Sequence, residues 1–192
     1  MNKIIKNTVI LTLITLIAGL ALGFVYEITK DPIAQAKDDA KKKAWQEVFP
    51  EADMNDFVAQ EVDQAAADAA IKAVGANATV DEVCKAGEDG YVVTTTSKEG
   101  YGGNIQITVG ITADGTVSGI SILSISETAG LGMKATEPAF YGQYEGKQAE
   151  KFAVSKDGGE GEPIDAISGA TITSRAVTAA VNVALAYYQN GF

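Results

Sequence analysis

The sequence predicts an α+β protein with a single amino-terminal transmembrane helix, a helical stalk, and an antiparallel sheet flanked by helices. Three observations support this fold class. A run of 19 residues without charge lies near the amino terminus, from Thr8 to Tyr26. A block beginning at about Thr79 alternates β-branched residues and is interrupted by glycine-containing turns. Helical patterns precede and follow that block, an order of elements typical of α+β domains.

Composition limits the chemistry that the chain can perform. At 192 residues, with 46% hydrophobic and 21% charged residues, it is long enough for one folded domain and a short appendage. A net charge of -10 makes nucleic acid a poor partner, because phosphate binding needs an excess of Lys and Arg. One cysteine and no histidine exclude an internal disulfide, a cysteine-ligated metal site and a Ser-His-Asp triad. We therefore expect no metal site and no catalytic residue, and any redox chemistry must come from a bound cofactor.

The first predicted element is a membrane anchor in residues 1–30. Its uncharged run is bounded by Lys6 and Glu27, and at about 1.5 Å per residue it matches the roughly 30 Å hydrocarbon core of a bilayer. A cleaved signal peptide is the alternative, because Ala-Leu-Gly before Phe24 resembles a cleavage site. The apolar run is longer than the usual signal-peptide core of about 7 to 15 residues, which favours a retained helix in contact with lipid.

Charge near the span gives a mixed indication of orientation. Lys3 and Lys6 favour a cytoplasmic amino terminus, yet Lys30, Lys37 and the run 41–43 follow the span closely. Long domains are translocated largely regardless of their charge. We therefore expect a single-pass protein of the cell membrane with its amino terminus in the cytoplasm and its main domain on the extracytoplasmic side.

Residues 31–78 are predicted to form a helical stalk and the start of the soluble domain. Asp31 is suited to an N-cap and Pro32 to the first helical position, and Pro50 ends this first helix. A second, alanine-rich helix is expected from Asp63 to Val74, with Gly75 as its stop signal.

Residues 79–192 are predicted to form the main domain. The turn sequences EDG, GYGG and ADG separate β-branched runs, which indicates an antiparallel meander of three or four strands. Cys84 lies in one of these runs and is expected to be a small core residue. The last helix is predicted from about Ser174 to Tyr188, where apolar residues recur at helical spacing.

A glycine-rich loop follows the predicted sheet. In SETAGLG, Gly130 and Gly132 flank Leu131, so backbone N–H groups there could approach a ligand closely. Glu127 and Thr128 offer an acceptor and a hydroxyl, and Lys134, two residues beyond the loop, offers a cation. Spacing alone is equally compatible with an ordinary tight loop.

A second polar segment, DAISGATIT, leads into the last helix. Helix amino termini present unpaired N–H groups and partial positive charge, which suits a phosphate. Gly169 permits the turn, and Ser168, Thr171 and Thr173 place hydroxyls near the helix start. The alternative is ordinary capping by Ser or Thr. A Walker-type phosphate loop is excluded, because the sequence G-x-x-x-x-G-K-[ST] does not occur.

The segment DAISGAT matches D-x-x-[ST]-G-A-T, the flavinylation motif of the FMN-binding domain family. The whole chain resembles the G subunits of Rnf electron-transport complexes, from the amino-terminal span through GYGGNIQITVGI and SETAGLG to SGATITSRAV. The resemblance implies that a separate flavin transferase joins FMN through its phosphate to the hydroxyl of Thr171. It implies that Asp165 and the Ser-Gly-Ala segment form the transferase's recognition element. It further places the flavin near the SETAGLG loop, with the Lys134 cation close to the phosphate. The residues expected to bind the cofactor are Thr171, Asp165, Ser168, Gly169, Ala170, Thr173, Glu127, Thr128, Gly130, Leu131, Gly132 and Lys134.

The resemblance also implies a function: the chain would be an electron-carrying subunit of a ferredoxin:NAD oxidoreductase complex coupled to sodium or proton translocation. Its partners would be polytopic membrane subunits and flavin or iron-sulfur subunits. One alternative is the C subunit of sodium-pumping NADH:quinone oxidoreductase, which bears the same motif on a usually longer chain. Another is a membrane-tethered binding module without a cofactor.

The chain departs from the commoner family pattern by having Ala129 where Pro is usual, and by lacking a His near Glu127. We expect the loop to be looser for that reason.

Overall fold

The structure is a computed structural model that describes residues 2–191. It comprises two compact units, Met1–Ala40 and Lys41–Phe192, and helix α1 (Lys3–Val48) continues from the first into the second. Among the described residues, α1 is the one helix long and apolar enough to cross a membrane, and none of its most apolar stretch is buried. The predicted apolar helix at the amino terminus is therefore present.

The prediction that a new helix begins at Asp31 and Pro32 is wrong, because Pro32 lies inside the continuous helix α1. Proline removes one backbone hydrogen bond from a helix interior. The segment after Pro32 is dominated by Ala and Lys, which are strong helix formers and favour continuation of the helix. The helix ends at Val48, two residues before Pro50.

After α1 the chain forms a 3₁₀ turn η1 (Met54–Asp56), strand β1 (Phe57–Gln60) and helix α2 (Gln64–Val74). The predicted second helix is confirmed. The Asp63 carboxylate accepts hydrogen bonds from the N–H groups of Ala65 and Ala66 at 2.8 and 3.2 Å. At the other end Gly75 adopts a left-handed conformation with φ of 71°. Strand β1 was not predicted, so this segment contributes to the sheet as well as carrying helices.

The main sheet is an antiparallel meander in which neighbours in sequence are neighbours in space, in the order β1-β2-β3-β4-β5-β6. Besides β1 it contains β2 (Ala78–Ala86), β3 (Gly90–Ser97), β4 (Ile105–Thr112), β5 (Thr116–Ser124) and β6 (Lys147–Gln148). The predicted antiparallel meander is confirmed, but it has more strands than expected. The expected three or four strands correspond to β2–β5, and two short edge strands, β1 and β6, complete the six.

Between β5 and the last helix lies a series of short elements. They are η2 (Gly132–Thr136), α3 (Pro138–Tyr141), β6, β7 (Phe152–Val154), η3 (Ser155–Asp157) and β8 (Glu162–Ile164). Strands β7 and β8 pair in parallel as a separate two-stranded sheet. The last helix, α4 (Thr171–Gly191), begins three residues earlier than predicted, so Thr171 is its first residue.

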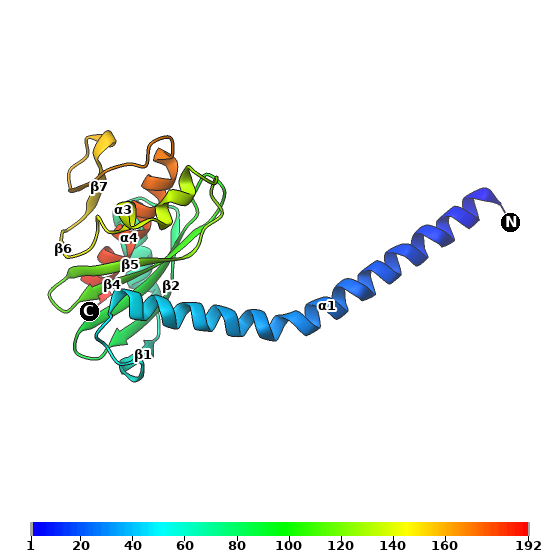
Figure 1. Cartoon of the computed structure of the whole chain (residues 1–192), viewed down its shortest axis with the longest axis horizontal. Helices are drawn as coiled ribbons and strands as arrows, with labels where there is room; N and C mark the ends of the chain where they lie inside the picture. Colours follow the sequence, from blue (N-terminus) through cyan, green and yellow to red (C-terminus); the bar gives the residue numbers. More distant parts are fainter. Residues whose placement is uncertain (1, 192) are drawn as a thin grey trace. The chain divides into compact units, whose positions relative to one another are not determined.

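The main sheet is covered on both faces (Figure 1). Consecutive residues of the central strands β3 and β4 are buried, so both faces of these strands need a covering layer. Val83 and Val93 belong to the larger core cluster, which includes the apolar face of α4 and the alanines of α2. Their neighbours Cys84 and Val92 point to the opposite face, into a smaller cluster with Val48 and other residues near the end of α1. Cys84 is 1% exposed, which confirms its prediction as a core residue.

Candidate functional site

The two polar motifs meet at one cavity of about 590 Å³. Three segments form its walls: the β3–β4 connection, the loop after β5, and the turn leading into α4. The lining residues are Tyr101, Glu127, Thr128, Leu131, Gly132, Gly169, Ala170, Thr171, Ile172 and Thr173. Eight of these ten were predicted from the sequence, and only folding brings the two motifs together.

The Glu127 carboxylate joins all three walls of this cavity. It is 9% exposed. Its Oε1 accepts a hydrogen bond from the Gly102 N–H at 3.1 Å, and its Oε2 accepts one from the Thr173 hydroxyl, also at 3.1 Å. A buried carboxylate needs such partners. Glu127 therefore fixes the cavity's shape, and the hydroxyl of Thr173 serves this contact rather than facing an open helix end.

Glycine at position 132 allows the loop to approach the helix closely. A Cβ atom at Gly132 would lie 2.6 Å from the Thr173 Oγ1 and 2.7 Å from the Glu127 Oε2. Both distances are shorter than nonbonded atoms tolerate, so the hydrogen bond between Glu127 and Thr173 requires glycine at this position.

The turn before α4 also depends on glycine. Gly169 has a φ of 77°, a conformation that other residues resist, and a Cβ there would lie 3.1 Å from the Leu131 side chain. The Ala170 N–H closes the turn on the Ile167 carbonyl at 3.0 Å. Leu131 and Gly169 thus bring the two motifs into contact at the cavity wall.

The start of α4 is not capped by a hydroxyl of Ser168 or Thr171. Ala170, whose carbonyl accepts the first helical hydrogen bond from the Ser174 N–H at 3.0 Å, occupies the N-cap position and has no polar side chain. Within residues 2–191 no acceptor is found for the N–H groups of Thr171, Ile172 and Thr173, and none for the Thr171 hydroxyl. The first helical turn therefore presents free donors and the free hydroxyl of the partly buried Thr171, and the alternative of ordinary Ser or Thr capping is not supported.

The cavity has an exposed apolar rim. Beyond α1, the large hydrophobic side chains that are exposed in the described chain are Val58, Tyr101, Leu131 and Ile172. The last three all line this cavity, with exposures of 73%, 42% and 48%. Exposed apolar groups gathered around a hollow mark a ligand site. Two of them, Tyr101 and Ile172, were missed at the sequence level, because GYGG was interpreted only as a turn and Ile172 lies between the two motif threonines.

Other predicted residues lie elsewhere. Lys134, Asp165 and Ser168 line a different hollow of about 230 Å³. There Asp165 accepts a hydrogen bond from the Ser155 hydroxyl at 3.0 Å, and its N–H donates to the Gln143 side chain at 2.7 Å. Gly130 has a φ of 74° in the loop but does not line the cavity beside Thr171. The structure thus separates the Lys134 cation from the hollow that Thr171 lines.

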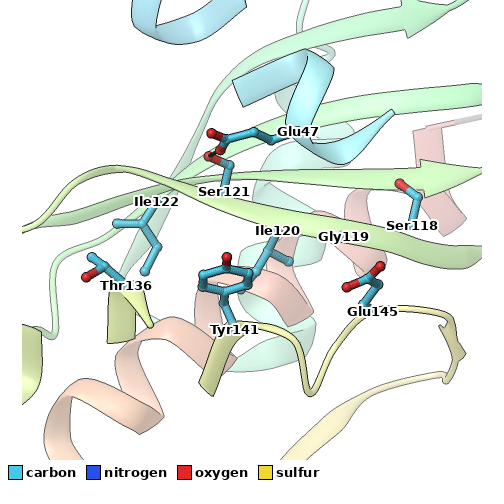
Figure 2. A pocket seen from close by; sticks show the side chains of 9 residues that line it. All are labelled: Glu47, Ser118, Gly119, Ile120, Ser121, Ile122, Thr136, Tyr141 and Glu145. Carbon is cyan, nitrogen blue, oxygen red and sulfur yellow. Dashed lines mark hydrogen bonds between the residues drawn. The ribbon is translucent and has the colours of Figure 1, made fainter. Parts of the chain in front are cut away.

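Another cavity, of about 420 Å³, lies along β5 (Figure 2). None of its lining residues belongs to SETAGLG or DAISGATIT. Its residues include Glu47, Ser121, Tyr141 and Glu145, and the Ser121 hydroxyl donates to Glu47 at 2.6 Å. Its lining includes no residue from the start of a long helix and none of the exposed large hydrophobic residues. Of these three hollows, the one beside Thr171 is the candidate site.

A free hydroxyl at an uncapped helix start, next to an apolar-rimmed hollow, is suited to a ligand that combines an anionic group with an apolar part. Comparison with known families agrees with this class of ligand. Residues 100–186 match the FMN-binding domain family, and residues 1–48 match the RnfG N-terminal region.

Individual relatives are similar over almost the whole chain. The chain is 35% identical to the G subunit of the Na(+)-translocating ferredoxin:NAD(+) oxidoreductase complex of Acetobacterium woodii, covering 97% of this chain and 92% of the relative. It is 35% identical to the G subunit of the proton-translocating complex of Clostridium ljungdahlii, covering 96% and 91%. It is 32% identical to the G subunit of the ion-translocating oxidoreductase complex of Methanosarcina acetivorans, covering 97% and 95%. The chain therefore belongs to the family of G subunits of ion-translocating (Rnf) oxidoreductase complexes.

Among solved structures, the crystal structure of Shewanella oneidensis NqrC aligns at 28% identity over 57% of this chain and 58% of that chain, with a TM-score of 0.45.

Proposed function

We propose that this chain is the electron-carrying G subunit of a ferredoxin:NAD oxidoreductase complex coupled to sodium or proton translocation, and that it carries FMN covalently on Thr171. The observation that carries the proposal is the position of this free hydroxyl. It lies at the uncapped start of α4, in the same cavity as the exposed Tyr101, Leu131 and Ile172. Flavin nucleotides combine the two properties that this site matches, a phosphate and a flat apolar ring.

The residues of this chain would position the cofactor, and FMN, when bound, would supply the acceptance and release of one or two electrons. The N–H groups at the start of α4 suit the phosphate, an interaction worth about 0.3 to 1 kcal/mol at an exposed site. The apolar rim suits the ring system. Glu127 and Gly132 would hold the wall against which the ring rests. No acid or base of this chain needs to take part.

Attachment requires a separate flavin transferase and an activated flavin nucleotide. The Thr171 oxygen would form a bond to the flavin's phosphorus while the bond from that phosphorus to a second phosphate breaks, and the hydroxyl proton would pass to a base of the transferase. Asp165 and Ser168 border the neighbouring hollow, which makes that face the proposed contact with the transferase. A covalent link would prevent loss of FMN outside the cytoplasm.

The proposed setting is the cell membrane. Residues 1–30 would anchor the chain in lipid as a single span, residues 31–78 would connect it to the soluble part, and residues 79–192 would hold FMN on the extracytoplasmic side. The partners would be polytopic membrane subunits, which would conduct the ion, and flavin or iron-sulfur subunits.

Labelling of a Lys156→Cys variant in intact cells by a membrane-impermeant maleimide tests this sidedness: absence of labelling until the cells are opened would place the domain in the cytoplasm.

Production of the full-length chain with and without a flavin transferase tests the attachment. Intact-mass measurement should show an increase equal to FMN less one water only with the transferase, and fragmentation should locate it on Thr171. Thr171→Ala should abolish the increase. Thr136→Ala, which removes an exposed hydroxyl outside the cavity, should keep it. A chain without added mass under both conditions would instead support a membrane-tethered module without a covalent cofactor.

A further inference from the structure

Arg175 lies one helical turn after Thr171 on α4. Residues four apart on a helix share a face, and long side chains on a helix lean toward its amino terminus. The stem of the Arg175 side chain therefore leans toward the first turn of α4, which contains Thr171. Arg175 is the sole basic residue of α4.

The guanidinium is held in a defined plane by Asp157 of η3. Arg175 Nε donates to Asp157 Oδ2 at 2.8 Å, and Nη2 donates to Oδ1. This two-bond fork uses two of the five N–H donors of the side chain and leaves three for another acceptor. The arrangement fits a cation that is oriented in advance for an anion, since the side chain of Arg175 remains 56% exposed.

Lys134, the cation expected from the sequence, is poorly placed for an anion on Thr171. Lys134 lines the separate hollow with Asp165 and Ser168. The cavity that contains Thr171 has no basic residue in its lining and has one carboxylate, Glu127. A phosphodiester on Thr171 would bring a second negative charge to this region, and Arg175 is the group whose position on α4 allows it to balance that charge.

We propose that Arg175 is the cationic partner of the phosphodiester on Thr171, and that Asp157 positions its guanidinium. The proposal replaces Lys134, the cation expected from the sequence. It rests on the proposed attachment of FMN to Thr171 and names a further cofactor-binding residue together with its positioning residue.

The test is a comparison of two charge states at Thr171 in the full-length chain in detergent. The chain is prepared unmodified and flavinylated, each as wild type, Arg175→Gln and the control Lys156→Gln, which removes an exposed cation next to Asp157. Thermal unfolding is followed by circular dichroism. Arg175→Gln should lower the melting temperature of the flavinylated chain by about 1 to 4 °C more than that of the unmodified chain. The excess should shrink at high salt, and Lys156→Gln should show no excess.

Phosphorus NMR of the flavinylated chain provides a readout that general loosening of the fold does not produce. The phosphodiester resonance should move in Arg175→Gln, should move less in Arg175→Lys and Asp157→Asn, and should stay in place in Lys156→Gln. Equal losses of melting temperature in both charge states, with an unmoved resonance, would overturn the role of Arg175 and leave the attachment intact. A wild-type chain that never acquires FMN on Thr171 would overturn both proposals.

Discussion

Thr173 donates its hydroxyl to the Glu127 carboxylate at 3.1 Å, across 46 residues of chain. This hydrogen bond joins the first turn of α4 to the loop after β5, and Glu127 extends the connection to the Gly102 N–H. The form of the cavity therefore depends on this one buried carboxylate.

Glu127→Ala should destabilise the soluble unit by about 1 to 3 kcal/mol, because it leaves the Thr173 hydroxyl and the Gly102 N–H without their acceptor. Glu127→Gln keeps one acceptor oxygen and should cost less. Urea unfolding followed by Trp45 fluorescence measures the loss, since this single tryptophan stacks on Phe57 with ring centroids 5.4 Å apart. Equal stability of wild type and Glu127→Ala would show that the carboxylate does not organise the cavity.

Gly132→Ala should also destabilise the domain, by about 1 to 3 kcal/mol, since the added methyl would overlap the Thr173 hydroxyl and Glu127. Gly159→Ala is the matched control, because the nearest atom to its added Cβ is 3.8 Å away. The same urea experiment compares the two variants. If Gly132→Ala proved as stable as Gly159→Ala, the close approach of loop and helix would be disproved.

The pair of Asp157 and Arg175 should make stability depend on acid pH. Hydrogen bonding and charge from Arg175 lower the pKa of Asp157 below its ordinary value of 3.8. The Asp157 carboxyl therefore binds a proton less tightly in the folded chain than in the unfolded chain. The pair with Arg175 stabilises the fold above about pH 4, and this stabilisation is lost as the pH falls below 3.8. Asp157→Asn should have a lower urea midpoint than wild type at pH 7, and the two midpoints should approach each other as the pH falls below 3.8. A difference that did not shrink as the pH fell below 3.8 would show that the variant acts through something other than this charge.

Cys84 should be chemically inert in the folded chain. Burial, with a smaller contribution from Glu82 and partial opposition from Lys41, raises the pKa of this thiol from 9.0 to about 12. At pH 8 iodoacetamide should label Cys84 roughly a thousandfold more slowly in the native chain than in urea, because alkylation needs the thiolate. Since the folded chain retains the proton, stability should fall as the pH rises above 9. Rapid labelling of the native chain would contradict the burial of β2.

Local signals in the sequence were sufficient for several elements. Asp63 and Gly75 bound α2 as predicted, because both caps act through their own neighbours in the chain. Strand β1 escaped prediction because its residues, FVAQ, are too few to show alternation and are largely exposed. Pro32 misled the prediction, since one lost hydrogen bond does not interrupt a helix that continues into a segment rich in Ala and Lys.

The site was predictable in its parts but not in its assembly. The two motifs contain nine of the ten lining residues, yet the contact between Glu127 and Thr173 arises only when β5 and α4 pack on the same core. Tyr101 joins them from the β3–β4 connection, which the sequence presents only as a turn. Lys134 lies two residues beyond the glycine loop, but η2 carries it to another hollow.

The meander has a consequence for the order of events during synthesis. Each strand of the main sheet pairs with the one made just before it, so the sheet can form progressively as the chain emerges. The cavity, in contrast, lacks a wall until α4, the final element, has docked. Thr171 thus acquires its surroundings last, and a modifying enzyme that reads the finished cavity would leave incomplete chains untouched.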